Sequence, residues 1–424
     1  MRATLATTGP MVRTVRRSAY EKSGGDHHHL GPWHHERRPT VVTEAAGSQS
    51  VIGWDGLGAL FDALHEGGFR VVGPSGRDGA IVLDELSSVR DLPVGLGDAQ
   101  DGGSYRITRR DDDAAFGYAV GPQSWRRFLT PPRELLWRGT KSSEGFTVDD
   151  PGGSTPPQRY AFVGVRACDL RAMEVQDQIF GESAFPDPRY ASRRADALII
   201  AVNCTEPGGT CFCVSMGTGP RARAGFDLAL TEILDGGHRF VVEVGTEVGA
   251  TLLAQIPHQP APTEDAARAE ALVEDAAGRM GRTLDSGGLR DLLAETLEHP
   301  RWHDVAERCL SCGNCTLVCP TCFCSTVEDT TDVTGDHAER WKRWDSCFTA
   351  EFSYLHGGSV RSSTRSRYRQ WLTHKLGTWH DQFGTSGCVG CGRCITWCPV
   401  GIDLTEEIAA LRRPAAGVAG DAAR

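Results

Sequence analysis

The sequence has no run of about 18 apolar residues, the length that a helix needs to cross a membrane. Arg16 and Arg17 are followed by Ser-Ala-Tyr-Glu-Lys instead of an apolar stretch, which argues against a secretory signal. The formal net charge of −10 disfavours nucleic acid as the main partner, because nucleic acids attract cationic surfaces. We therefore expect a cytoplasmic protein that binds other proteins, and neither a membrane nor nucleic acid.

Signals for a bound dinucleotide are also weak. Gly95-Leu-Gly97 is not completed at position 100, which is Gln, and Gly217-Thr-Gly219 opens no evident strand–helix unit. A dinucleotide-binding turn needs its glycines because the backbone must approach the pyrophosphate closely. The sequence therefore gives little support for a nicotinamide or flavin dinucleotide bound by this chain.

Cysteine, in contrast, is abundant: the 424 residues include 15 cysteines. Their bunching in short motifs indicates metal ligation in a reducing compartment instead of disulfides. Residues 309–320 and 388–399 share the spacing C-x2-C-x2-C-x3-C-P. This spacing is typical of [4Fe-4S] ligation, whereas structural zinc sites use four ligands in pairs.

The first three cysteines of each motif are close enough in sequence to hold one cube, and the fourth points away from it. In two-cluster ferredoxins this fourth cysteine binds the other cluster. We therefore expect crossed ligation of two [4Fe-4S] clusters. Cluster 1 would be held by Cys309, Cys312, Cys315 and Cys398, and cluster 2 by Cys388, Cys391, Cys394 and Cys319.

The chain before these motifs has the pattern of an α/β domain. Leu57, Leu60, Phe61 and Leu64 have the spacing of an amphipathic helix. The runs 161–165 and 197–202 are continuously apolar, which is typical of strands buried on both faces of a parallel or mixed sheet. Further strands are expected at 69–72, 81–83, 105–107 and 240–244.

These features predict an α+β fold, in which an N-terminal α/β domain with a mixed sheet precedes a helical dicluster ferredoxin-like domain. The Trp-rich segment between the two motifs is expected to be helical, because it is too long for the short connection of a compact ferredoxin. The expected parts are a disordered, His-containing tail at 1–48, the α/β domain at 49–256, a helical bridge at 257–300, the cluster domain at 301–410 and a flexible C-terminus at 411–424.

Four further cysteines follow the two apolar strands. Cys168 and Cys204 come shortly after 161–165 and 197–202, and Cys211-Phe-Cys213 follows on a glycine-containing loop. Carboxyl ends of neighbouring parallel strands meet at one sheet edge, where α/β proteins place their sites. Cys168, Cys204, Cys211 and Cys213 are therefore candidates for a third iron–sulfur site, with buried packing as the alternative.

Three cysteines remain in the cluster domain. Cys322 and Cys324 follow the first motif directly, and Cys347 lies further along the insert. They are candidate ligands of another site, although thiols that only pack around the cubes are the simpler interpretation. A basic run that ends at Lys375 would either raise the reduction potentials of nearby clusters or meet an acidic partner.

Together these motifs resemble one known family. Gly-Val-Arg-Ala-Cys168-Asp, Thr210-Cys-Phe-Cys213, the first motif with its Cys-Pro-Thr-Cys-Phe-Cys324 ending and the second motif look like the iron–sulfur β subunit of cytoplasmic sulfhydrogenases, which are NAD(P)-linked nickel–iron hydrogenases. The A subunit of anaerobic sulfite reductase is similar over the same span.

The resemblance implies an electron-transfer subunit without turnover of its own. Its partners would be a flavin subunit that binds NAD(P) and the small and large subunits of a nickel–iron hydrogenase, or instead sulfite reductase subunits. The chain has no paired C-x2-C plus histidine set for a nickel–iron centre and no sirohaem-type cysteine pairing. A stand-alone iron–sulfur flavoenzyme, with flavin at the Cys168 edge, is the competing class.

Overall fold

The computed structural model describes residues 49–150 and 158–414, and the described residues belong to one compact unit. The expected tail at 1–48 and most of the expected C-terminal extension lie outside them. Within the described ranges, no helix combines the length and the apolar character that a membrane span requires.

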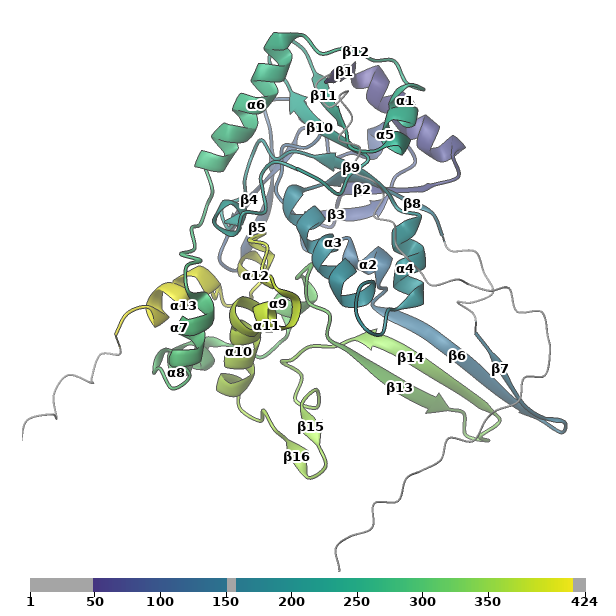
Figure 1. Ribbon diagram of the computed structural model, residues 1–424, viewed down its shortest axis with the longest axis vertical. Helices are drawn as coiled ribbons and strands as arrows, with labels where there is room; N and C mark the ends of the chain where they lie inside the picture. Colours follow the sequence, from purple (N-terminus) through teal and green to yellow (C-terminus); the bar gives the residue numbers. More distant parts are fainter. Residues whose placement is uncertain (1–48, 151–157, 415–424) are drawn as a thin grey trace, which may run out of the picture. The chain divides into compact units, whose positions relative to one another are not determined.

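The main element is an eight-stranded sheet (Figure 1). Its strands are β1 (Ser50–Gly53), β2 (Arg70–Arg77), β3 (Ala80–Glu85), β8 (Tyr160–Val165), β9 (Leu198–Val202), β10 (Leu228–Ile233), β11 (Arg239–Val244) and β12 (Gln259–Pro260). The spatial order is β12-β1-β11-β10-β9-β8-β2-β3. The pairs within β10-β9-β8-β2 are parallel and the others antiparallel, so the expected mixed sheet is confirmed.

Helices cover both faces of this sheet. One face carries α1 (Trp54–Glu66) and α5 (Glu247–Leu253), and the other carries α2 (Arg126–Leu129), α3 (Ala167–Phe180), α4 (Pro188–Ala195) and α6 (Thr263–Gly278). On β9, Ile200 packs with the first set and Ile199 with the second. The central strands are therefore buried on both faces, as their continuous apolar sequence predicts.

Helix α1 illustrates how the sequence fixes these layers. Its apolar residues recur at helical spacing, and Leu57, Leu60, Phe61 and Leu64 are all buried against the sheet. The helix ends at Gly67, which forms its C-cap before β2 begins.

A second sheet joins parts of the chain that are far apart in sequence. Its order is β13-β14-β6-β7, with β6 (Arg133–Ser142), β7 (Gly145–Asp149), β13 (Ser325–Thr331) and β14 (His337–Trp344). β14, from the insert between the two cysteine motifs, pairs antiparallel with β6. The expectation of a wholly helical insert is wrong here: Trp341 and Trp344 lie on β14, whose alternating side chains find a strand partner in β6.

The remaining elements surround the cysteine motifs. The helices are α7 (Leu289–Glu295), α8 (Arg301–Arg308), α9 (Asn314–Leu317), α10 (Thr364–Thr373), α11 (Trp379–Phe383), α12 (Arg393–Thr396) and α13 (Leu404–Leu411). Single helical turns occur at η2 (Val89–Asp91), η3 (Cys213–Met216) and the π-helical η4 (His374–Thr378), and short hairpins at β4–β5 (Leu96–Asp101, Ser104–Arg109) and β15–β16 (Tyr354–Leu355, Gly358–Ser359). Their buried apolar residues, among them Trp302, Trp371 and Leu376, form a second core against which several motif cysteines pack.

Candidate iron–sulfur centres

The two cysteine motifs have the same backbone structure. In each, a glycine with positive φ, Gly313 or Gly392, caps a four-residue helix that contains the third cysteine. Glycine adopts this left-handed conformation without steric cost, so the chain can curl back within a few residues. The side-chain amide of Asn314 donates to the carbonyl of Trp397 at 2.7 Å and ties the two motifs together.

The thiols expected to bind cluster 1 lie together. Cys309, Cys312, Cys315 and Cys398 line one cavity, whose wall also includes Cys394, Tyr368 and Trp371. Burial raises the pKa of Cys309, and the neighbouring Cys398 and Cys312 raise it further. Cys398 from the second motif thus lies beside the first three cysteines of the first motif.

The thiols expected to bind cluster 2 form a corresponding group. Burial raises the pKa of Cys388 to about 12, and Cys391 and Cys319 add to this increase against the opposing effect of Lys375. The pKa of Cys394 is raised by burial and then by Cys388, Cys391 and Cys319. Cys319 from the first motif therefore lies among the first three cysteines of the second.

These arrangements fit [4Fe-4S] clusters better than single metal ions. No three His, Cys, Asp or Glu side chains within residues 49–150 and 158–414 stand close enough to hold one ion. The sulfurs that bind one zinc ion all lie about 2.3 Å from it. A cube instead binds each cysteine at a different iron, so its ligand sulfurs stand further apart, like the thiols that line the common cavity.

The sheet brings the third group of cysteines together. β8 and β9 are parallel neighbours; Cys168 lies on the first turn of α3 after β8, and Cys204 comes two residues after the end of β9. Burial raises the pKa of Cys213, and Cys204 and Cys211 raise it further. Cys168 packs against Cys213 in a small buried cluster. The four thiols thus gather at the carboxyl ends of the two strands.

A buried cation accompanies this third group. Arg166 is only 2% exposed and donates to the carbonyls of Phe116 and Tyr118 at 2.7 and 3.0 Å. It pairs with no carboxylate among the described residues, and its Nε has no hydrogen-bond partner. Burial raises the pKa of Cys204, whereas Arg166 lowers it. Thiolates at this position would balance the buried guanidinium.

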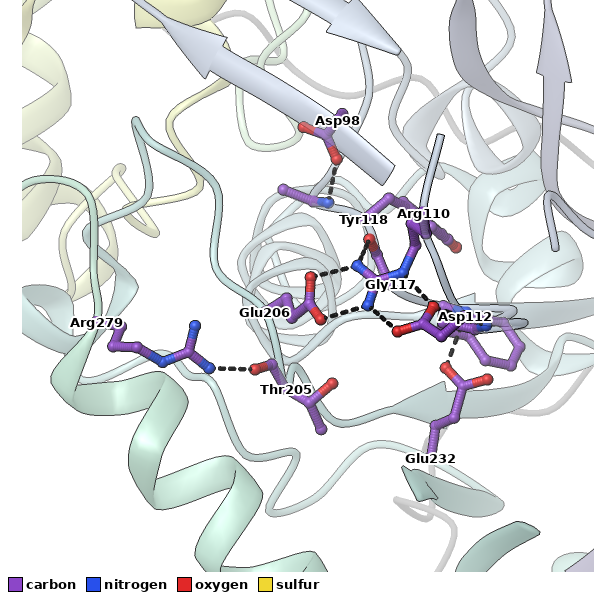
Figure 2. A network of polar contacts seen from close by, with 12 residues as sticks. Asp98, Arg110, Asp112, Gly117, Tyr118, Thr205, Glu206, Glu232 and Arg279 are labelled. Atoms are coloured by element: carbon purple, nitrogen blue, oxygen red, sulfur yellow. Dashed lines mark hydrogen bonds and ion pairs between the residues drawn. The ribbon is translucent and has the colours of Figure 1, made fainter. Parts of the chain in front are cut away.

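Polar contacts fix the loop that follows Cys204 (Figure 2). The guanidinium of Arg110 lies between the carboxylates of Glu206 and Asp112, with nitrogen–oxygen distances of 2.6 to 2.8 Å. Arg279 donates to the carbonyl of Thr205 at 2.9 Å. Arginine side chains thus bind both Thr205 and Glu206, and these charge-assisted hydrogen bonds hold the loop after Cys204 in place.

The third group touches the cluster 2 motif through its backbone. The amide of Phe212 donates to the carbonyl of Gly390 at 2.8 Å. A Cβ at Gly390 would lie 2.6 Å from the carbonyl oxygen of Phe212, and a Cβ at Gly392 would lie 2.4 Å from Oγ1 of Thr210. These two glycines are therefore needed for the close approach as well as for positive φ. As a result, Cys211 Sγ lies 3.9 Å from the carbonyl of Cys391.

Asp169, which directly follows Cys168, forms an ion pair with an arginine of the second motif. Its two carboxylate oxygens accept from the guanidinium of Arg393 at 2.9 and 3.0 Å. Both side chains are at most 3% exposed, so the pair is a buried, bidentate connection between α3 and α12.

The last three cysteines, Cys322, Cys324 and Cys347, also converge; we call them the outer group. The neighbouring Cys347 thiol lowers the pKa of Cys324 to about 7. Cys322 lies beside Cys319, and a hydrogen bond between the two thiols raises the pKa of Cys322. Sequence reasoning identified these residues as candidates, but did not show that they lie together.

Sequence reasoning missed the buried cations beside the thiols. Lys375 lies on η4, inside the core, and its Nζ is 3.2 Å from Sγ of Cys319. Arg365 and Arg369, from the same basic run, bind the exposed Glu298 instead. A run of charges in a sequence does not reveal which member turns inward. Lys375 lies on the π-helical turn 374–378, and the sequence did not predict that turn.

A comparison with protein families matches the part of the chain that contains the two cysteine motifs. Residues 308–402 match the family described as the 4Fe-4S dicluster domain. The fold and the candidate centres thus define an iron–sulfur protein in which a two-cluster domain follows an α/β sheet domain.

A curated relative extends the match over most of the chain. Sulfhydrogenase 2 subunit beta of Pyrococcus furiosus is 31% identical over 356 residues, which cover 83% of this chain and 95% of the relative. The chain therefore belongs to the family of sulfhydrogenase iron–sulfur β subunits. No solved structure matched.

The buried pair of Asp169 and Arg393 gives a first testable prediction. Asp169→Asn should lower the free energy of unfolding by about 3–5 kcal/mol, because it leaves a guanidinium buried without a counter-charge. Glu85→Gln, which removes the carboxylate from a half-exposed ion pair with Arg70, should cost less than about 1 kcal/mol. Urea unfolding followed by tryptophan fluorescence measures both, and equal costs would contradict this account.

Proposed function

We propose that this chain relays electrons in a cytoplasmic complex, between a flavin subunit that binds NAD(P) and the subunits of a nickel–iron hydrogenase. The chain itself has no turnover in this proposal. Bound [4Fe-4S] clusters would supply one-electron redox centres. Membership in the sulfhydrogenase family supports the hydrogenase assignment.

The observation that carries the proposal is that the cluster 1, cluster 2 and third groups of cysteines adjoin one another in that order. The cluster 1 and cluster 2 groups meet where Cys315 lies near Cys394. The cluster 2 and third groups meet where Cys211 approaches Cys391. Electron relay needs neighbouring centres in a protected medium, and an unbroken series from the cluster 1 cavity to the sheet edge supplies that arrangement.

The chain's own residues set the conditions for transfer. Trp302, Trp371 and Leu376 exclude water from the motifs, which lowers the local dielectric constant and so influences reduction potential. Lys375 and Arg166 place positive charge beside the thiols and thereby favour the reduced, more negative state. Of the cysteines in the described residues, only Cys312 is exposed, so we place one end of the relay there.

In the proposed ligation, Cys309, Cys312, Cys315 and Cys398 hold cluster 1, and Cys388, Cys391, Cys394 and Cys319 hold cluster 2. Cys168, Cys204, Cys211 and Cys213 hold a third cluster. Thiols from different motifs lie together in the first two groups, which supports the crossed scheme.

The crossed scheme predicts which cluster each variant damages. Cys319→Ser should change the EPR signal of the reduced cluster held by the second motif, because Cys319 lies among Cys388, Cys391 and Cys394. Cys398→Ser is the matched control and should change the other signal. The scheme is wrong if each serine alters only the cluster of its own motif.

The third cluster predicts a higher iron content than the two motifs supply. A Cys211→Ala, Cys213→Ala double variant should lose about four iron atoms per chain relative to the wild type, since one cube holds four. Iron analysis of anaerobically purified protein measures the difference. An equal iron content in both proteins would leave the third group without a cluster.

The relay itself is tested in the assembled complex. Cys391→Ser lies where the second and third groups meet, so it should abolish hydrogen-dependent reduction of NAD(P). Dye-linked activities of the partner subunits should persist, because those assays bypass this chain. Full hydrogen-dependent activity in the variant would show that electrons take another route.

A further inference from the structure

The outer group consists of cysteines that the proposed relay does not use. Cys322 and Cys324 follow Pro320 within four residues, and Cys347 comes three residues after the end of β14. The amide of Asp345 donates to the carbonyl of Cys324 at 2.9 Å, which brings the two segments together. Cys322 is buried, and the other two are half-buried. Three thiols from two segments thus face a common interior region.

Two buried cations border this region. Arg126 is 5% exposed, stacks on Trp344 with 3.5 Å between guanidinium carbon and ring centroid, and donates to the carbonyl of Cys322. Its Nε has no hydrogen-bond partner. Lys375 is 3% exposed and contacts Cys319 Sγ, Thr321 Oγ1 and the carbonyl of Gly387 at 3.1 to 3.2 Å.

Neither cation has a carboxylate within 4.0 Å among the described residues. A buried charge without a counter-charge costs several kcal/mol, and in proteins such charges are normally paired or coordinated to metals. Neutral thiols cannot supply the missing negative charge. Thiolates can, and they persist in an apolar interior when they are bound to metal.

The proposed cluster 2 would supply a counter-charge for Lys375, but it does not fully account for the buried charge of Arg126. Cys319, in the cluster 2 group, faces Lys375. Arg126, however, interacts first with Cys322 and then with Cys319 and Cys324. The cysteine nearest in effect to Arg126 is therefore Cys322, whose carbonyl it also contacts and to which the relay assigns no metal.

A single ion does not suit these thiols. Within the described residues no three potential ligands stand close enough to hold one ion, and structural zinc takes four ligands. An iron–sulfur cluster binds each thiolate at a separate iron, so three cysteines are enough to hold one. Cys319 serves cluster 2, which leaves three cysteines here.

We propose that Cys322, Cys324 and Cys347 hold a further iron–sulfur cluster with three cysteine ligands, charge-balanced by Arg126. Each thiol releases its proton on binding iron. One iron of such a cube carries no thiolate. Oxidation releases that iron preferentially and leaves a [3Fe-4S] cluster, which three cysteines can hold.

The test compares variants of the full chain purified without oxygen. Cys324→Ala together with Cys347→Ala should lower iron by about three to four atoms per chain, since one cluster is lost. After ferricyanide oxidation, the wild type should show the EPR signal of an oxidised [3Fe-4S] cluster, and the double variant should lack it. Phe323→Leu is the control: it changes the side chain between two of the thiols, keeps all three, and should keep iron and signal.

Three results would overturn the proposal. The first is equal iron in wild type and double variant. The second is iron loss from Phe323→Leu as large as that from the double variant, which would assign the loss to packing. The third is the absence of a [3Fe-4S] signal in the wild type after oxidation. This result would contradict the proposal even if the double variant did not fold, because it is measured on the wild type alone. The signals of clusters 1 and 2 and the iron lost with Cys211 and Cys213 are separate measurements, so failure here and failure of the relay are distinguishable.

Discussion

The arrangement of the whole site depends on one backbone contact, in which the segment 210–213 lies directly on Gly390 and Gly392. Neither glycine could carry a side chain there without moving the opposing backbone. The contact brings cysteines at the edge of the main sheet against cysteines of the second motif. The buried pair of Arg393 and Asp169 strengthens it, because the guanidinium lies between α12 and α3 and bonds to both carboxylate oxygens.

Charge explains much of the remaining interior. Arg126, Arg166 and Lys375 are buried cations without carboxylate partners among the described residues, and each one lies beside cysteine. Elsewhere in the interior the chain pairs its charges in the ordinary way, as Glu407 does with Arg301 and Arg308. Unpaired cations thus occur where thiolate-bound clusters would supply negative charge, and this correlation is independent of the cysteine spacing.

The sequence predicts local elements and short motifs of this structure better than contacts between distant segments. Helical periodicity predicted α1, because one face of that helix is buried, and continuous apolar runs predicted β8 and β9, which are buried on both faces of the sheet. The motif spacing predicted eight cysteine ligands in a crossed grouping, because short loops leave few geometries; the crossed ligation stays a prediction. The strand β14 was missed, because its partner β6 lies about two hundred residues away and β pairing is determined by tertiary context. The inward turn of Lys375 was missed for a related reason: its thiol partner belongs to another segment.

The pairing of β6 with β14 has a consequence for how the protein is made. When residues 133–142 leave the ribosome they can pair only with β7, and their other edge remains open until residues 337–344 follow. At about 5–20 residues per second, this delay lasts roughly ten to forty seconds. An open strand edge is a site for aggregation or for binding by chaperones. Because β14 lies between the two cysteine motifs, the second sheet can close only after the first motif has been synthesised and before the second motif follows.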